Sequence, residues 1–115
     1  MDAVTTLLKC LKSKRFINDV DKAKSEVTTE TITLRREDDL FIRDAITGFG
    51  TILKEDLENH YYITTVKIGN FGNTLTQAII MREEASAEIA VYAHEGFIKQ
   101  HLADKTIQKL KEILC

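Results

Sequence analysis

The chain has 115 residues, of which 43% are hydrophobic and 30% are charged, and its net charge is −2. This size and composition predict one soluble globular domain that spans residues 1–115. No stretch approaches the roughly 18 uninterrupted apolar residues of a membrane span, and no secretory signal pattern is expected at the N-terminus. The two cysteines, Cys10 and Cys115, require no oxidising compartment. We therefore expect a cytoplasmic protein without a membrane partner.

Charge is unevenly distributed along the chain. Residues 1–24 contain six basic and three acidic residues, whereas residues 25–60 contain four basic and nine acidic ones. The only concentrated basic stretch is Lys9–Arg15, where positive charge at a helix C-terminus complements the helix dipole. Nucleic-acid binding requires a concentrated basic surface, so we expect no nucleic-acid partner.

The first third of the chain predicts a helix followed by a strand. Over residues 2–13 the apolar residues follow the i, i+3, i+4, i+7 spacing of one helical face, namely Val4, Leu7, Leu8 and Leu11. Residues 14–26 are polar and charged, with at most another turn or two of helix. Residues 27–36 are rich in threonine and alternate apolar with polar side chains, which predicts an edge strand.

A middle helix over residues 40–57 is the next predicted element. Its apolar residues fall within one half of a helical wheel: Phe41, Ile42, Ala45, Ile46, Phe49, Ile52, Leu53 and Leu57. Gly48 and Gly50 oppose this prediction, since each costs roughly 1 kcal/mol in a helix interior. The alternative is a break at 47–50 with a shorter helix after it. We favour one kinked or continuous helix, preceded by acidic residues that suit a helix N-terminus.

Three apolar, β-prone runs fill residues 61–94 and are separated by the turn-like sequences NFGN and EEASA. This pattern predicts an antiparallel three-stranded meander. A closing helix is predicted over residues 97–114 by its apolar stripe. The fold class that follows is α+β. We expect a mainly antiparallel sheet formed by the meander and the 27–36 strand. Helices at the N-terminus, the middle and the C-terminus should pack on it in two or three layers.

The sequence contains no catalytic, metal or cofactor signature. His94, Glu95 and His101 lack the H-E-x-x-H spacing of a zinc site, and whether they meet in space stays open. The Gly48–Gly50 stretch is a lone G-x-G without the strand–turn–helix context of a nucleotide fingerprint. No G-x-S-x-G occurs. We therefore expect no metal and no cofactor, and we favour a non-enzymatic function.

Two binding functions compete on the residues. Strand alternation allows Ile63, Ile80 and Tyr92 to share one outer sheet face, with Phe71 at a turn tip. This predicts an interaction or regulatory module that binds itself or another protein, most simply as a homodimer. The alternative is a small apolar ligand held between the sheet and the 40–57 helix, near Gly48, Phe49 and Gly50. An enzyme whose site is invisible in sequence is the third reading. Whether the 40–57 helix or a second chain covers the outer face is left open.

Overall fold

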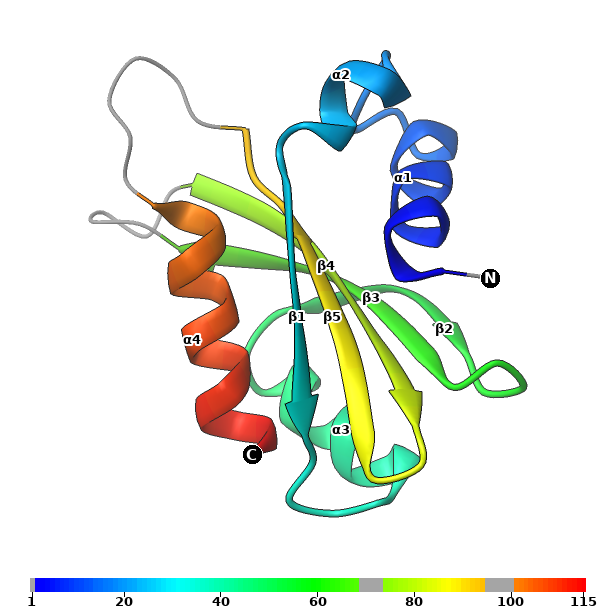
Figure 1. Cartoon of the computed structure of the whole chain (residues 1–115), viewed down its shortest axis with the longest axis vertical. Helices are drawn as coiled ribbons and strands as arrows, with labels where there is room; N and C mark the ends of the chain where they lie inside the picture. The colour runs from blue at the N-terminus through cyan, green and yellow to red at the C-terminus, as the bar shows by residue number, and fades with distance from the viewer. Residues whose placement is uncertain (1, 69–73, 95–100) are drawn as a thin grey trace.

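The computed structural model describes residues 2–68, 74–94 and 101–115, and Figure 1 shows how its helices and strands are arranged. The predicted α+β class is confirmed. The helices are α1 (Ala3–Ser13), α2 (Val20–Lys24), α3 (Asp39–Thr47) and α4 (Leu102–Leu114). The strands are β1 (Val27–Thr33), β2 (Thr51–Asp56), β3 (Tyr61–Ile68), β4 (Thr74–Glu83) and β5 (Ser86–Tyr92). In the described ranges, no helix combines the length and the apolar character that crossing a bilayer requires.

The five strands form one antiparallel sheet in the order β1-β5-β4-β3-β2. The predicted meander is confirmed as β3, β4 and β5, and β1 is an edge strand, as its polarity predicts. Pairing of β1 with β5 ends at Thr33, so the strand is shorter than the predicted 27–36. Beyond it, the amide of Arg35 donates to the carbonyl of Leu114 at 2.7 Å, which ties the end of α4 to this edge.

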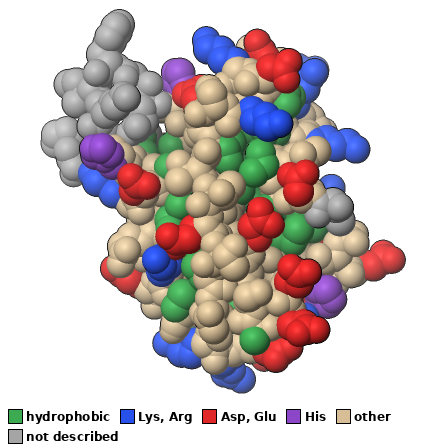
Figure 2. Space-filling model, in the orientation of Figure 1, with side chains coloured by type: hydrophobic (Ala, Val, Ile, Leu, Met, Phe, Trp, Pro, Cys, Tyr) green, Lys and Arg blue, Asp and Glu red, His purple; other side chains and the backbone are tan. Residues whose placement is uncertain are grey.

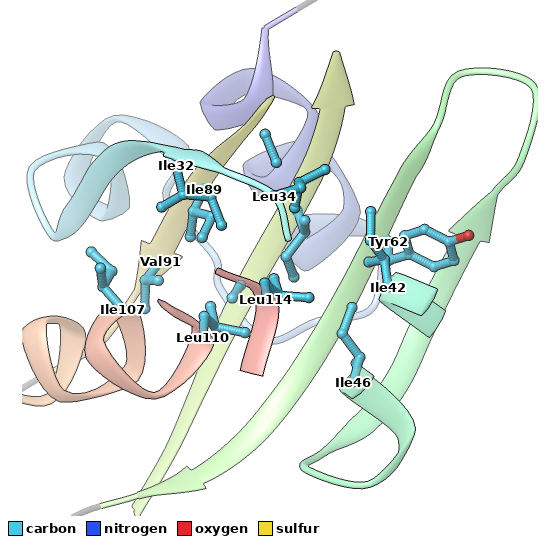
Figure 3. Packing of buried hydrophobic residues seen from close by; sticks show 13 residues of the cluster. Ile32, Leu34, Ile42, Ile46, Tyr62, Ile89, Val91, Ile107, Leu110 and Leu114 are labelled. Atoms are coloured by element: carbon cyan, nitrogen blue, oxygen red, sulfur yellow. The ribbon is translucent and has the colours of Figure 1, made fainter. Parts of the chain in front are cut away.

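Helices cover both faces of the sheet, so the molecule has three layers (Figure 1). Helices α3 and α4 pack on the face that carries Tyr62, Ile80 and Ile89, and Figure 3 shows this core. Helices α1 and α2 pack on the opposite face, against Ile63 and Ile79. Side chains alternate along a strand, so each central strand contributes to both cores.

Short acidic caps begin three of the four helices. Asp2 accepts a hydrogen bond from the Thr5 amide, Asp19 from the Lys22 amide, and Asp38 from the Leu40 amide. These carboxylates satisfy backbone amides that have no partner within the helix. The acidic run before the middle helix therefore has the capping role that its sequence predicts.

The predicted continuous helix over residues 40–57 is wrong. Helix α3 ends at Thr47, and residues 51–56 form edge strand β2. The alternative correctly placed a break at 47–50, but a strand and not a helix follows it. A Cβ atom on Gly50 would lie 2.4 Å from the carbonyl oxygen of Thr65 on β3. Gly50 therefore allows the chain to approach β3 closely as it enters the sheet.

Candidate interaction surface

A groove of about 510 Å³ lies between α1 and α2. Its floor is apolar: Leu8 is buried, while Val4 and Val20 are half-buried and open to the groove. The inner side of α1 buries Leu7 and Leu11 in the core beneath. Helix α2 has only five residues, so it cannot close over the outer part of α1. The groove follows from this mismatch in length.

Lysines surround this apolar floor. Lys9, Lys12 and Lys24 line the groove and are all exposed, and Asp21 is the one acidic residue in its lining. Long lysine stems can rest on apolar surface while their ammonium groups stay in water. The groove therefore combines an apolar floor with a net positive rim.

A second hollow, of about 490 Å³, lies on the other side of α1 and shares Lys9 with the groove. Lys14 and Lys54 also line it, with Tyr61 and the buried thiol of Cys10. The ammonium of Lys54 lies 5.8 Å from the centroid of the Tyr61 ring. A hydrogen bond with Tyr61 is the main cause of the raised pKa of Lys54. Helix α1 thus has basic hollows on both flanks.

The space-filling view shows the same asymmetry. In Figure 2, Lys and Arg side chains gather at the end of the molecule where α1 and α2 lie, and acidic side chains predominate on the right-hand side below them. The sequence places the basic excess in residues 1–24 and the acidic excess in residues 25–60. The basic excess of residues 1–24 thus lies at the α1–α2 end, where Lys54 of β2 adds to it, although Lys and Arg side chains are also visible at the bottom of Figure 2.

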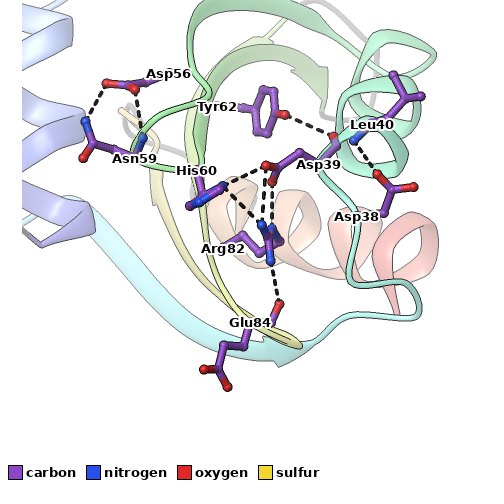
Figure 4. A network of polar contacts seen from close by, with 9 residues as sticks. All are labelled: Asp38, Asp39, Leu40, Asp56, Asn59, His60, Tyr62, Arg82 and Glu84. Carbon is purple, nitrogen blue, oxygen red and sulfur yellow. Dashed lines mark hydrogen bonds and ion pairs between the residues drawn. The ribbon is translucent and has the colours of Figure 1, made fainter.

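A polar network lies at the opposite end of the sheet, where α3 begins (Figure 4). Arg82 Nε donates to Asp39 Oδ1 at 2.7 Å, and Arg82 Nη2 donates to Oδ2 at 3.4 Å. His60 Nδ1 lies 2.8 Å from the same Oδ2. Hydrogen bonding from Arg82, with a smaller contribution from His60, lowers the pKa of Asp39, and the carboxylate in turn raises the pKa of Arg82.

This network holds α3 against the sheet. The hydroxyl of Tyr62 on β3 donates to the backbone carbonyl of Asp39 at 3.1 Å, and burial raises the pKa of Tyr62 to about 12. Arg82 Nη1 also donates to the Glu84 carbonyl at 3.2 Å in the β4–β5 turn. Asp39 thus accepts hydrogen bonds from two strands, and we assign it a positioning role.

The predicted interface set does not form one surface. Ile63 and Ile80 are both fully buried, with 0% exposure, but in different cores on opposite faces. Tyr92 is half-buried on the face of Ile63. Phe71 lies outside the described residues. The prediction of a common outer face is therefore wrong, because the chain's own helices cover both faces of the sheet.

The three residues predicted for the alternative, a small-ligand site, line one hollow. Gly48, Phe49 and Gly50 line a hollow of about 330 Å³ with side chains of β3 and β4, among them Lys67 and Leu75. It lies at the α3–β2 joint, not beneath a helix over residues 40–57. This position follows from the strand that the sequence analysis missed.

The three histidines have separate surroundings. His94 Nδ1 lies 2.8 Å from Glu26 Oε2, and His101 Nδ1 lies 3.8 Å from Asp104 Oδ2. Glu95 lies outside the described residues. Among the residues that the structure describes, no group of three or more His, Cys, Asp or Glu side chains is placed to hold a metal ion.

No protein-family model and no curated protein sequence matches the chain. Among solved structures, it is similar to a TBP-like protein from Parabacteroides distasonis, with a TM-score of 0.37 and 10% sequence identity. The similarity covers 57% of this chain and 53% of that one, or about half of each. At this level the likeness carries no argument about function.

Proposed function

We propose that the protein is a non-catalytic interaction module whose α1–α2 groove binds an acidic, amphipathic segment of a protein partner. The observation that carries the proposal is the lysine rim of Lys9, Lys12 and Lys24 around an apolar floor. An amphipathic helix commonly binds by laying its apolar face in such a groove. Charge of opposite sign at the rim speeds encounter and selects among partners.

The binding surface proposed here lies on helices α1 and α2, whereas the sequence predicted it on the sheet. Ile63 and Ile80 are buried beneath helices of their own chain, so a partner could reach them only if a helix left the sheet. The α1–α2 groove requires no such rearrangement, because its floor residues Val4 and Val20 are only partly buried and already line the groove. This difference favours the groove as the place where binding costs least.

The test is a titration with a fluorescent helical peptide that carries leucines on one face and glutamates on the other. We expect binding that weakens as salt is added, because exposed charges are screened. The double variant Lys9→Glu, Lys12→Glu should weaken it at least about tenfold, since like charges would then meet at the rim. A peptide with lysines in place of the glutamates should not bind.

Lys109→Glu is the matched control, because Lys109 is also an exposed helical lysine but lies on α4 beside Glu112. It should leave the affinity for the acidic peptide unchanged. Equal affinity of the wild type and the Lys9→Glu, Lys12→Glu variant, or no binding of the acidic peptide at all, would overturn the proposal.

A second candidate function is the binding of a small apolar ligand in the hollow at Gly48, Phe49 and Gly50. Its volume of about 330 Å³ is at the lower end of ordinary ligand sites, which supports this alternative. Native mass spectrometry of the protein as purified should then show a retained mass that Leu75→Glu abolishes. A spectrum of the bare chain alone would argue against it.

A further inference from the structure

We propose that the partner of the α1–α2 groove is a second copy of this chain, and that the turn around Leu57 occupies the groove. This inference rests on the proposed function, because it names the partner of the same site. It is carried by an exposed leucine whose acidic surroundings complement the lysine rim. We call residues 55–59 the Leu57 turn.

Leu57 has an unusual position for a large apolar residue. Its side chain is 57% exposed, at the connection between β2 and β3. This connection projects at the right of Figure 1, at the end of the β2–β3 hairpin. Leu57 is not among the residues that line the groove of its own chain, so it is free to meet the groove of a neighbouring molecule.

Side-chain hydrogen bonds hold the Leu57 turn in one shape. The amide of Asn59 donates to Asp56 Oδ1 at 3.0 Å, and Asn59 Nδ2 donates to Asp56 Oδ2 at 3.0 Å (Figure 4). These bonds from Asn59 favour the ionised form of Asp56 and lower its pKa. A segment that is already ordered loses little conformational entropy when it binds.

The charges of the two surfaces are opposite. Three acidic residues flank Leu57, namely Glu55, Asp56 and Glu58. The guanidinium of Arg43 lies 3.3 Å from the Glu55 carboxylate and offsets part of its charge. Across the contact, three lysines line the groove, and Asp21 is the acidic residue among the described residues of its lining. The Leu57 turn thus presents an apolar side chain between carboxylates to an apolar floor between ammonium groups.

Leu40 is another exposed leucine with which Leu57 can be compared as the occupant of the groove. It is 58% exposed, almost the same as Leu57. However, Leu40 lines a hollow in which Arg35 and Arg36 stand beside Asp38, Asp44 and Glu112. The charges around Leu40 are therefore mixed, and Arg36 pairs with Asp38 at 3.8 Å. Leu57 complements the lysine rim better, because the residues on both sides of it, Asp56 and Glu58, are acidic.

The test uses two variants that each remove one half of the contact. The groove variant is Lys9→Glu, Lys12→Glu, and the turn variant is Leu57→Ser, Glu58→Lys. Sedimentation velocity over a micromolar to near-millimolar series should show that the wild type gains mass with concentration. Each variant alone should remain a monomer, with its dissociation constant raised at least about tenfold. Circular dichroism checks that both variants are folded.

Mixing the two variants is the decisive measurement. The intact turn of the groove variant can still enter the intact groove of the turn variant, so an equimolar mixture should form a one-to-one heterodimer. Leu40→Ser is the matched control and should associate as the wild type does. A wild type that is monomeric throughout, variants that still self-associate, or a mixture that stays monomeric would each overturn the inference.

The peptide titration separates this failure from failure of the proposed function. If the acidic peptide binds the groove while the wild type stays monomeric, the groove stands as a binding site and the partner is another protein. If the peptide also fails to bind, the groove itself is rejected.

Discussion

The two faces of the sheet are covered in different ways. On one face, α3 and α4 have nine and 13 residues, and their starts and ends are tied to the sheet by the Asp39–Arg82 and Arg35–Leu114 hydrogen bonds. On the other face, α1 has 11 residues but its neighbour α2 has only five. Helices α3 and α4 close the core beneath them. Helices α1 and α2 also close a core, but they leave an apolar groove between them at the surface.

The hollows on the two faces also differ in how their apolar side chains are covered. Between α3 and α4, Arg35 and Arg36 lie over the ring of Phe41, at 5.1 and 5.8 Å from its centroid. Cation–π contacts thus cover the Phe41 ring there, while Leu40 in the same hollow is 58% exposed. Between α1 and α2 the lysines stand around Val4 and Val20 in the rim of the groove. Both faces bury a core, and the α1–α2 face is the one that we propose for binding.

Ile80→Glu is expected to have the largest effect. Ile80 is fully buried beneath α3 and α4, so an unpaired carboxylate there should cost more than about 4 kcal/mol and unfold the chain. Leu75→Glu is the control on the same strand, because Leu75 is exposed, and it should stay folded. Circular dichroism separates the two outcomes. A folded Ile80→Glu protein would show that α3 and α4 can leave this face.

Leu110→Ala tests the closed face with a smaller change. Leu110 is fully buried on α4, so its truncation should lower the free energy of unfolding by about 2–5 kcal/mol in urea melts. Val20→Ala on α2 should cost only about 1 kcal/mol or less, because Val20 is only partly buried. Similar losses for the two variants would contradict the contrast between the faces.

The sequence predicted most of the secondary structure, because long apolar periodicities depend on local spacing. It failed at residues 48–57, where the apolar residues fit a helical wheel almost as well as a half-buried strand. Gly50 was the available signal. Its cost in a helix is small, but its need to lie against Thr65 could be seen only once β3 was placed beside it.

Strand register was the second feature that the sequence did not reveal, and it is the reason that the predicted interface is wrong. Alternation within each strand was right, but Ile63 pairs with Ile79, and Ile80 pairs with Tyr62. A shift of one residue moves a side chain to the other face of a sheet. The composition of the strands does not fix this register. The groove was equally hidden, since it depends on how a five-residue helix packs beside α1.

Gly50→Ala tests the joint between α3 and β2. The added methyl group would lie 2.4 Å from the Thr65 carbonyl oxygen, so the strand must shift, at about 1–3 kcal/mol. Gly48→Ala is the control: its Cβ would lie 3.8 Å from its nearest neighbours, and it should change stability by less than about 1 kcal/mol. Urea melts that rank the two variants in the reverse order would contradict the close approach.

Asp39→Asn should weaken the closed face in a pH-dependent way. The pKa of Asp39 is lowered in the folded chain, chiefly by Arg82, so its ionised form stabilises the fold above the unfolded pKa near about 3.9. That stability is lost as the pH falls through the folded pKa. The variant should therefore be about 1 kcal/mol less stable at pH 7, with the difference shrinking toward acid. Asp44→Asn, an exposed change on the same helix, is the control and should change stability at pH 7 by less than about 0.5 kcal/mol.

The smallest perturbation is thiol labelling, which leaves the fold intact and reports on the open face. Cys10 is a core-facing residue of α1 and is 8% exposed, whereas Cys115 is exposed at the end of α4. In native buffer Cys115 should react quickly and Cys10 slowly, because a buried thiol reacts mainly when its helix opens from the sheet. Cys115→Ser isolates the slow reaction, and a rate that rises with urea would confirm local opening of α1. Equally fast labelling of both thiols would show that α1 does not stay packed on the sheet, and the groove would then have no fixed floor.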